Sequence, residues 1–364
     1  MKRRLIGLQA CILALLITAG CNSRINTVEI KPEETDMAEV ATEKTDDAAS
    51  ASETSRDIFA MDTYMTVTAY GEQSEAAVTA AEAEIERLDS LLSTGDTESE
   101  IYKLNQNGSA VLSEDASYLV ERAIELNEET DGAFDIAIYP VMEAWGFPTQ
   151  NYQVPSEETI QLLLPLTDAS EMLYEKDSRK ISFGKEGMKI DLGGIAKGYT
   201  SARIIDIFKE YDISSAMVNL GGNVQVLGTK TDGNLWRIAI QNPDDEEDYL
   251  GILSVRDKAV ITSGGYERFF EQDGKTYHHI IDPETGYPAE NGLTSVTIVS
   301  TDGTLADGLS TSLFIMGKEK AAEFWKEHSE EFDAILLTED GTLYVTEGIE
   351  NDFSTDFSME VIRK

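Results

Sequence analysis

A break in composition near residue 57 limits where this 364-residue chain can fold. Residues 22–56 contain no leucine and no aromatic side chain, and they are rich in Glu, Asp, Thr, Ala and Ser. Such a segment buries too little apolar surface to offset the conformational entropy lost on folding. We therefore expect residues 21–56 to form a flexible acidic tether, residues 57–350 to form the catalytic domain, and residues 351–364 to be a C-terminal tail. A disordered partner-binding segment is a weaker alternative for the tether, because it contains no apolar anchor.

The first twenty residues read as a targeting segment. Basic residues at positions 2–4 precede a mostly apolar run over positions 5–17, which is shorter than the roughly 20 residues that a membrane-spanning helix needs. This arrangement is typical of a secretory signal peptide, and the Thr-Ala-Gly-Cys ending at residues 18–21 resembles a bacterial lipoprotein signal. We expect residues 1–20 to be removed, Cys21 to be lipidated, and the protein to be extracytoplasmic and lipid-anchored to the bacterial cell membrane. An ordinary signal peptide or an uncleaved anchor is the alternative.

Charge and cysteine content exclude several classes of function. The chain has 29 Lys and Arg against 68 Asp and Glu, a formal net charge of −39. Such a chain cannot replace the counterions of a polyanion, so we expect no nucleic-acid partner. Its two cysteines, Cys11 and Cys21, both precede the folded part. The folded part therefore has no cysteine for a disulfide, a metal site or a nucleophile.

Apolar periodicity predicts a mixture of helices and strands. Residues 64–70 read as a strand, and apolar side chains spaced by three and four over residues 78–92 predict a helix. Further helices are expected over residues 113–127 and from Ser156 to near residue 165. Further strands are expected over residues 216–219, 224–227, 236–241, 251–255, 275–281 and 295–300. The absence of a regular strand–helix–strand rhythm favours an α+β fold with mixed or antiparallel sheets and flanking helices, in a single unit.

Two glycine-containing motifs are candidates for ligand binding. Residues 130–135 read Thr-Asp-Gly-Ala-Phe-Asp, for which core packing beside a turn is the simpler interpretation. Residues 190–199 hold Gly193 and Gly194 and then Lys197, between an expected strand and an expected helix. Glycines there would let backbone N–H groups approach phosphate oxygens at a helix N-terminus, and the lysine adds positive charge. The spacing matches no common phosphate-binding loop, so a structural turn is an equal alternative.

Two further motifs carry side chains suited to proton transfer and to metal binding. Adjacent residues in a strand point to opposite faces, so His278 and His279 are not expected to share a metal. One of them could transfer a proton or contact phosphate while the other is solvated; a strand entering an Asp-Pro turn is the alternative. Asp307 and Thr311 would share one face of a helix. Their oxygens suit Mg²⁺, and a capping or surface role for the aspartate is the alternative.

Taken together and in this order, the motifs resemble those of the FAD:protein FMN transferase family, the thiamine-biosynthesis lipoproteins of the alternative-pyrimidine-biosynthesis type. The resemblance covers roughly residues 58–345. It rests on DGAFD (131–135), DLGGIAKGY (191–199), NLGG (219–222), TSGGYERFF (262–270), HIIDPETGYP (279–288) and ADGLSTSLFIMG (306–317).

The resemblance implies an activity, a cofactor and a partner. FMN would be transferred from FAD to a threonine hydroxyl of an exported or membrane redox protein, with Mg²⁺ as cofactor and AMP as the leaving product; Mn²⁺ accepts the same oxygen ligands. Acceptors in the family carry a short Ser/Thr-Gly-Ala-Ser/Thr motif. This chain lacks that motif, so it resembles the enzyme and not the acceptor.

Position by position, the resemblance also implies roles for individual residues. The expected contacts to FAD are Met61, Ala133, Phe134, Asp135, Asp191, Lys197 and Ile281. The expected metal ligands are the carbonyl of Gly194 and the side chains of Asp307 and Thr311, with Ser310 as an additional contact. His279 matches the histidine that assists transfer, and Asp307 is the alternative proton acceptor.

The sequence departs from the family pattern at two places. The common Met-Gly-Thr is Met61-Asp62-Thr63 here, which puts an extra acid near the expected flavin site. Gly95 stands where relatives often carry tyrosine, at a position linked to whether FMN is transferred or FAD is hydrolysed. Two rival functions therefore remain: an Mg²⁺-dependent FAD pyrophosphatase that releases FMN and AMP, and a flavin-binding lipoprotein without turnover.

Overall fold

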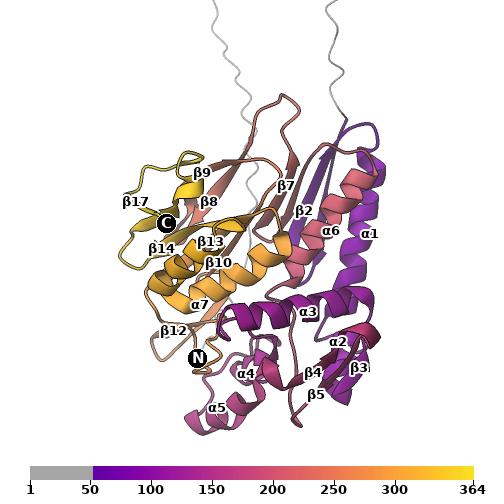
Figure 1. Ribbon diagram of the computed structural model, residues 1–364, viewed down its shortest axis with the longest axis vertical. Coiled ribbons are helices and arrows are strands. Elements are labelled where there is room, and N and C mark those ends of the chain that lie inside the picture. Colours follow the sequence, from indigo (N-terminus) through magenta and orange to yellow (C-terminus); the bar gives the residue numbers. More distant parts are fainter. Residues whose placement is uncertain (1–51) are drawn as a thin grey trace, which may run out of the picture. The chain divides into compact units, whose positions relative to one another are not determined.

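The computed structural model describes residues 52–364, and these form one compact unit (Figure 1). Cys21, the expected signal peptide and nearly all of the expected tether lie outside the described residues. Within residues 52–364 no helix has the length and apolar character needed to cross a membrane.

A nine-stranded sheet forms the centre of the unit, in the order β1-β2-β6-β7-β10-β13-β14-β15-β17. Neighbouring strands are antiparallel except β15 and β17, which are parallel. The strands are β1 (Glu53–Ala60), β2 (Thr63–Tyr70), β6 (Ser215–Leu220), β7 (Asn223–Gly228), β10 (Ala259–Gly264), β13 (Leu293–Ser300), β14 (Phe332–Thr338), β15 (Leu343–Thr346) and β17 (Met359–Ile362).

Helices pack on one face of this sheet and a second sheet packs on the other. The long helices α1 (Ser74–Leu92), α6 (Ala196–Glu210) and α7 (Gly303–His328) contact its strands directly (Figure 1). On the other side an apolar layer, with Val226, Val260 and Val299 from the large sheet, meets side chains of a three-stranded sheet. That sheet has the order β16-β9-β8, formed by β16 (Phe353–Ser354), β9 (Asp245–Val255) and β8 (Trp236–Asn242).

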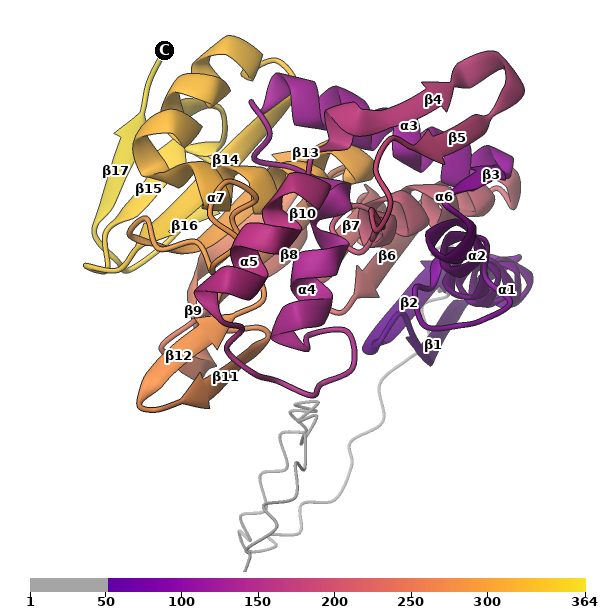
Figure 2. The same cartoon turned by 90° about the horizontal axis from the view of Figure 1, so that it is seen from below.

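Smaller elements close one end of the sheet. Helices α4 and α5 pack with the β11–β12 hairpin in a cluster that includes Trp145, Phe147 and Ile160 (Figure 2). A further small sheet has the order β3-β5-β4. These elements are α2 (Glu100–Asn107), α3 (Glu114–Glu129), α4 (Tyr139–Trp145), α5 (Glu157–Leu163), β3 (Ser109–Val111), β4 (Met172–Glu175), β5 (Lys180–Phe183), β11 (Phe269–Gln272) and β12 (Lys275–His278), with 3₁₀ turns at Ile136–Ile138, Leu164–Leu166, Ala169–Glu171, Lys176–Ser178 and Glu347–Ile349.

Capping side chains define where the helices begin. The hydroxyls of Ser99, Ser113 and Ser156 accept hydrogen bonds from backbone N–H groups in the first turns of α2, α3 and α5. Asp302 does the same for α7. Each such cap satisfies a donor that the helix itself cannot satisfy.

The predicted α+β class, with antiparallel pairing and flanking helices, is confirmed. The strand over residues 64–70 and the helices over residues 78–92 and 113–127 are present with small differences at their ends. The strand predicted over residues 275–281 is too long, because β12 ends at His278. Beyond it the chain bends toward the Asp282-Pro283 turn, and Ile281 makes only an isolated bridge to Pro288.

The fold is longer at both ends than the composition predicted. Strand β1 begins at Glu53, four residues before the expected start of the domain at residue 57, and needs no leucine because only Ile58 and Ala60 are buried in it. The expected tail at residues 351–364 holds β16 and β17. Phe353 is buried against the second sheet, so this segment belongs to the core.

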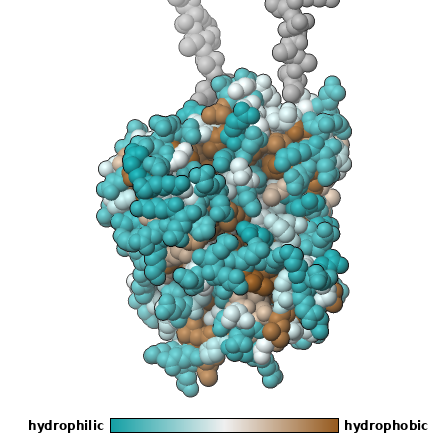
Figure 3. Space-filling view, viewed as in Figure 1, coloured by the Kyte–Doolittle hydropathy of each residue, from teal (hydrophilic) through white to brown (hydrophobic). Residues whose placement is uncertain are grey.

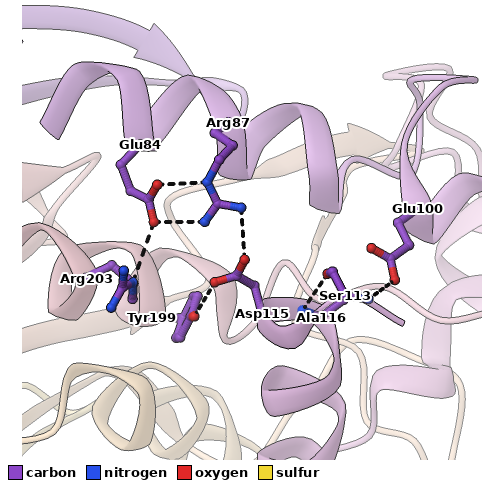
Figure 4. A network of polar contacts seen from close by, with 8 residues as sticks. All are labelled: Glu84, Arg87, Glu100, Ser113, Asp115, Ala116, Tyr199 and Arg203. Carbon is purple, nitrogen blue, oxygen red and sulfur yellow. Dashed lines mark hydrogen bonds and ion pairs between the residues drawn. The ribbon is translucent and has the colours of Figure 1, made fainter. Parts of the chain in front are cut away.

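A polar network joins α1, α3 and α6 (Figure 4). Arg87 on α1 pairs with Glu84 and, at 2.9 Å, with Asp115 near the start of α3. Asp115 also accepts a 2.5 Å hydrogen bond from the hydroxyl of Tyr199, and Arg203 lies 3.5 Å from Glu84. Since Tyr199 is in the first turn of α6, the network holds the N-terminal end of that helix against its neighbours. The face shown in Figure 3 is mostly hydrophilic, in keeping with the excess of acidic residues.

Candidate active site

One large cavity, of about 1090 Å³, gathers the predicted site residues. It is larger than the roughly 300–1,000 Å³ of sites for drug-sized ligands. Segments from the β1–β2 turn, the α3–α4 connection, the start of α6, the β6–β7 turn, β8, β10, the segment after β12 and α7 contribute to its wall. Every predicted FAD contact, metal ligand and catalytic residue within residues 52–364 lines it: Met61, Ala133, Phe134, Asp135, Asp191, Gly194, Lys197, His279, Ile281, Asp307 and Thr311.

A close crossing of α6 and α7 positions Asp307. A Cβ on Gly198 would lie 2.1 Å from the carbonyl oxygen of Gly303 and 2.6 Å from Cβ of Asp307, so only glycine fits at this crossing. The Gly198 N–H donates to Oδ2 of Asp307 at 2.8 Å, and the Asn223 amide donates to Oδ1 at 2.8 Å. The carboxylate is therefore held rigidly at the cavity wall from two sides.

Asp307 is a buried carboxylate near the positive charge of Lys197. It is 5% exposed, and burial raises its pKa, opposed by the charge of Lys197 and by the hydrogen bonds that the carboxylate accepts. Thr311 lies one turn later on α7, and its hydroxyl is 3.4 Å from that of Ser263. Ser310 is fully buried and bonds Ser263 and the Asp307 carbonyl. It does not line the cavity, so the additional contact expected of it is not available in this conformation.

Positive charge at the cavity comes from Lys197 and Arg268. Neither side chain forms an ion pair within 4 Å in the part of the chain that the structure describes. Glu267 lines the cavity beside them with an exposed side chain, and its pKa is raised by partial desolvation at the cavity wall, with Lys197 lowering it and Asp307 raising it. The cavity thus offers two cations that an anionic ligand could pair with.

His279 is on the cavity wall and is held through one ring nitrogen. Its Nδ1 lies 3.2 Å from the carbonyl oxygen of Arg268. Its ring packs edge-on against Phe147, with centroids 6.4 Å apart. The half-buried ring has its pKa lowered to about 3, by enclosure in the cavity wall and then by the charges of Arg268 and Lys197, while the bond to the Arg268 carbonyl opposes the shift. A neutral imidazole at neutral pH is able to accept a proton.

The neighbouring His278 points elsewhere, as expected for adjacent residues near a strand end. Its Nε2 lies 3.1 Å from the Ala289 carbonyl, and its ring packs against Phe314. The expectation that the second histidine is solvated is wrong, because its half-buried ring packs against α7 and one ring nitrogen lies against a backbone carbonyl. It does not line the cavity.

The β1–β2 turn explains the first departure from the family pattern. Met61 and Asp62 both have positive φ, 48° and 58°, as a two-residue type I′ hairpin requires. Aspartate tolerates this conformation better than most residues other than glycine and asparagine. The Met61 N–H donates to Asp89 at 3.1 Å. An aspartate therefore replaces the usual glycine here without breaking the turn, and adds its charge at the cavity.

The two aspartates expected to contact FAD are partly occupied by backbone donors. Asp135 accepts from the N–H groups of Ala137 and Ala169 at 2.7 and 3.0 Å, and burial raises its pKa to about 7. Asp191 accepts from the Gly193 N–H at 2.9 Å, and burial raises its pKa while Arg268 lowers it. Asp135 therefore has a clear structural role whatever it binds.

Sequence reasoning missed several residues of the cavity wall. Glu267 and Arg268 belong to a quoted motif but had no expected role, and Asn223 was not singled out beside the Asn219–Gly222 motif. The sequence feature that could have indicated them is that each is a polar residue shortly after a pair of glycines, at 221–222 or 264–265, where a strand ends or turns. The contact between Asn223 and Asp307 joins residues 84 positions apart, which no local pattern reveals.

Comparison with known proteins identifies the family. A family model described as the ApbE family matches residues 61–336. The chain belongs to the ApbE family. The family expected from the motifs is therefore confirmed. A curated relative from Klebsiella pneumoniae (strain 342), named FAD:protein FMN transferase, is 36% identical over 258 residues, covering 70% of this chain and 79% of the relative. One of the same name from Treponema pallidum (strain Nichols) is 33% identical over 323 residues, covering 83% and 89%.

Solved structures of ApbE proteins share the fold. The ApbE protein of Thermotoga maritima is 33% identical with a TM-score of 0.78, covering 83% of this chain and 99% of that one. The flavin transferase ApbE from Vibrio cholerae is 29% identical with a TM-score of 0.75, covering 82% and 99%. The α+β arrangement described above is thus the ApbE arrangement.

Proposed function

We propose that this ApbE-family protein is an FAD:protein FMN transferase. The observation that carries the proposal is the single cavity in which a neutral histidine, a buried aspartate and two unpaired cations come together. The names of the Klebsiella and Treponema relatives support it. A binding protein without turnover has no need of a proton acceptor such as His279 or of a buried carboxylate such as Asp307.

The reaction transfers a phosphoryl group and needs no oxidant or reductant. The hydroxyl oxygen of an acceptor threonine forms a bond to the phosphorus of the FMN half of FAD. The pyrophosphate P–O bond breaks, and AMP leaves with the bridging oxygen. The hydroxyl proton passes to Nε2 of His279, which is neutral and unprotonated there. Lys197 and Arg268 stabilise the negative charge on the phosphates.

The residues present fit a magnesium ion. The carbonyl of Gly194, the Asp307 carboxylate and the Thr311 hydroxyl are hard oxygen donors, and the three residues line the same cavity. The oxygens of Asp307 accept hydrogen bonds from the Gly198 N–H and the Asn223 amide, and lone-pair capacity remains on the carboxylate for a metal ion. Bound there with substrate phosphates, Mg²⁺ would neutralise charge on the phosphate oxygens; Mn²⁺ would serve similarly.

The partner and the location belong to the same proposal. The acceptor would be an exported or membrane redox protein with a Ser/Thr-Gly-Ala-Ser/Thr threonine motif. Lipidation at Cys21 would hold the enzyme on the outer side of the bacterial cell membrane, where such acceptors lie. The sequence of residues 1–21 supports this location.

The proposal is tested with the purified full chain, FAD, Mg²⁺ and a domain that carries the threonine motif. We expect intact-mass spectrometry to show one FMN added to the acceptor, and chromatography to show one AMP released for each FMN. An acceptor with its threonine changed to valine is the control and should stay unmodified. AMP and free FMN with an unmodified acceptor would favour the pyrophosphatase, and tight FAD binding without turnover would favour the binding protein.

Gly95 makes hydrolysis the second candidate, and it yields a separate prediction. Gly95 lines the cavity, and a Cβ there would meet only the Ser93 hydroxyl, at 3.8 Å. The open space would let water approach the flavin end. We expect Gly95→Tyr to lower the ratio of free FMN to acceptor-bound FMN several-fold, because the ring shields the site. Gly95→Ala, which adds no ring, should leave the ratio unchanged; an unchanged ratio in the tyrosine variant would contradict this role.

A further inference from the structure

The main chain of Arg268 determines which nitrogen of His279 is free. The carbonyl oxygen of Arg268 accepts the His279 backbone N–H at 3.0 Å and lies 3.2 Å from Nδ1 of the same residue. A carbonyl only accepts hydrogen bonds, so Nδ1 must carry the hydrogen in the neutral ring. Nε2 is then the nitrogen with a lone pair.

The side chain of Arg268 connects its own segment to the segment that contains Phe147. Its guanidinium donates to the carbonyl oxygen of Phe147 at 3.3 Å. The ring of Phe147 in turn packs on His279. Arg268 therefore connects the segment whose carbonyl bonds Nδ1 with the segment whose phenylalanine ring packs against the imidazole.

The charges around His279 all disfavour its protonation. Arg268 immediately before β11 and Lys197 in α6 each lower its pKa, in addition to burial, as does His278 at the end of β12 when that ring is protonated. Phe147, from the segment after α4, contributes no charge. Of these charges, that of Arg268 has the largest effect after burial, and the bond from Nδ1 to the Arg268 carbonyl acts in the opposite direction.

We propose that Arg268 is the positioning residue for His279, holding the imidazole as the neutral Nδ1–H tautomer so that Nε2 is the proton acceptor. The part played by Nε2 rests on the proposed function, whereas the tautomer and the charge state of His279 do not. Arg268 thereby acts through His279, in addition to contributing positive charge to the cavity.

Nitrogen-15 NMR of the histidine rings tests this without any turnover. The chain has only three histidines, so the full chain labelled at histidine gives few signals, and His279→Gln assigns the one of interest. We expect wild-type His279 to show the Nδ1–H tautomer and to remain neutral from pH 8 to about 5. In Arg268→Met we expect it to titrate at least about one pH unit higher and to show a mixture of tautomers.

Two variants separate charge from general disturbance. Arg268→Lys keeps the cation and should keep His279 neutral over the same range. Arg256→Met removes an exposed arginine that pairs with Asp257 and should leave the His279 signals unchanged. Thermal denaturation of each variant verifies that it is folded.

Kinetics add a second readout. In Arg268→Met we expect the kcat for FMN transfer to fall at least about tenfold with the KM for FAD little changed, and the acid limb of the pH profile to move upward. A wild-type His279 that titrates near pH 6.5, or one whose signals are identical in Arg268→Met, would overturn the inference. So would an increase in the KM for FAD with an unaltered histidine. If the NMR results are as expected but the wild-type protein does not transfer FMN, the inference about His279 stands and the proposed function fails.

Discussion

Asp307→Ala is expected to lower FMN transfer by roughly 10²–10³-fold, the usual effect of removing one electrostatic stabiliser of a transition state. The carboxylate is 5% exposed and is held by Gly198 and Asn223 at the cavity wall. Its removal deletes the charged ligand of the proposed magnesium site. The measurement is the initial rate of acceptor flavinylation at saturating FAD and Mg²⁺.

A binding readout separates loss of the metal from loss of structure. In the wild type, Mg²⁺ added with FAD should raise the melting temperature, because a ligand that binds only the folded state stabilises it. In Asp307→Ala this rise should disappear. Glu323→Gln, which removes an exposed charge from the same helix, should retain both the rate and the rise. A variant that keeps wild-type transfer would exclude Asp307 from the chemistry.

Gly198→Ala is expected to destabilise the fold by about 1–3 kcal/mol, the typical cost of overpacking. In a helix interior alanine would otherwise gain up to about 1 kcal/mol over glycine. Here the new methyl would lie 2.1 Å from the Gly303 carbonyl oxygen, and backbone atoms on both helices would have to move. The clash outweighs the gain in helix propensity. It would also pull the Gly198 N–H away from Asp307, so transfer should fall as well.

A second glycine in the same region is the matched control. A Cβ on Gly308 would approach Leu126 to 2.5 Å, but through the end of a flexible side chain. Gly308→Ala should therefore cost less than Gly198→Ala. Urea unfolding followed by circular dichroism measures both. Equal destabilisation of the two variants would mean that the α6–α7 crossing tolerates a methyl group and that its close approach is not required.

Local patterns determined much of the fold. The spacing of Val78, Ile85 and Leu92 marks α1, and Ser113 and Ser156 mark the starts of α3 and α5. Helix periodicity and capping depend on residues three or four positions apart, so they can be predicted from a short stretch of sequence. Local patterns do not reveal pairing between distant segments. The prediction of a tail after residue 350 was therefore wrong, because β17 is stabilised by pairing with β15 and not by its own composition.

Motifs in the sequence also identified the family and a set of site residues that lie around one cavity. The tertiary structure alone decided how they are held. The bond from Asn223 to Asp307 and the bond from His279 to Arg268 depend on how β7, α7, β11 and β12 meet. Sequence patterns indicate the type of side chain a site needs. The charge state of Asp307 and the free nitrogen of His279 depend instead on burial and on neighbours brought close by folding, because electrostatic interactions act through space and not along the chain.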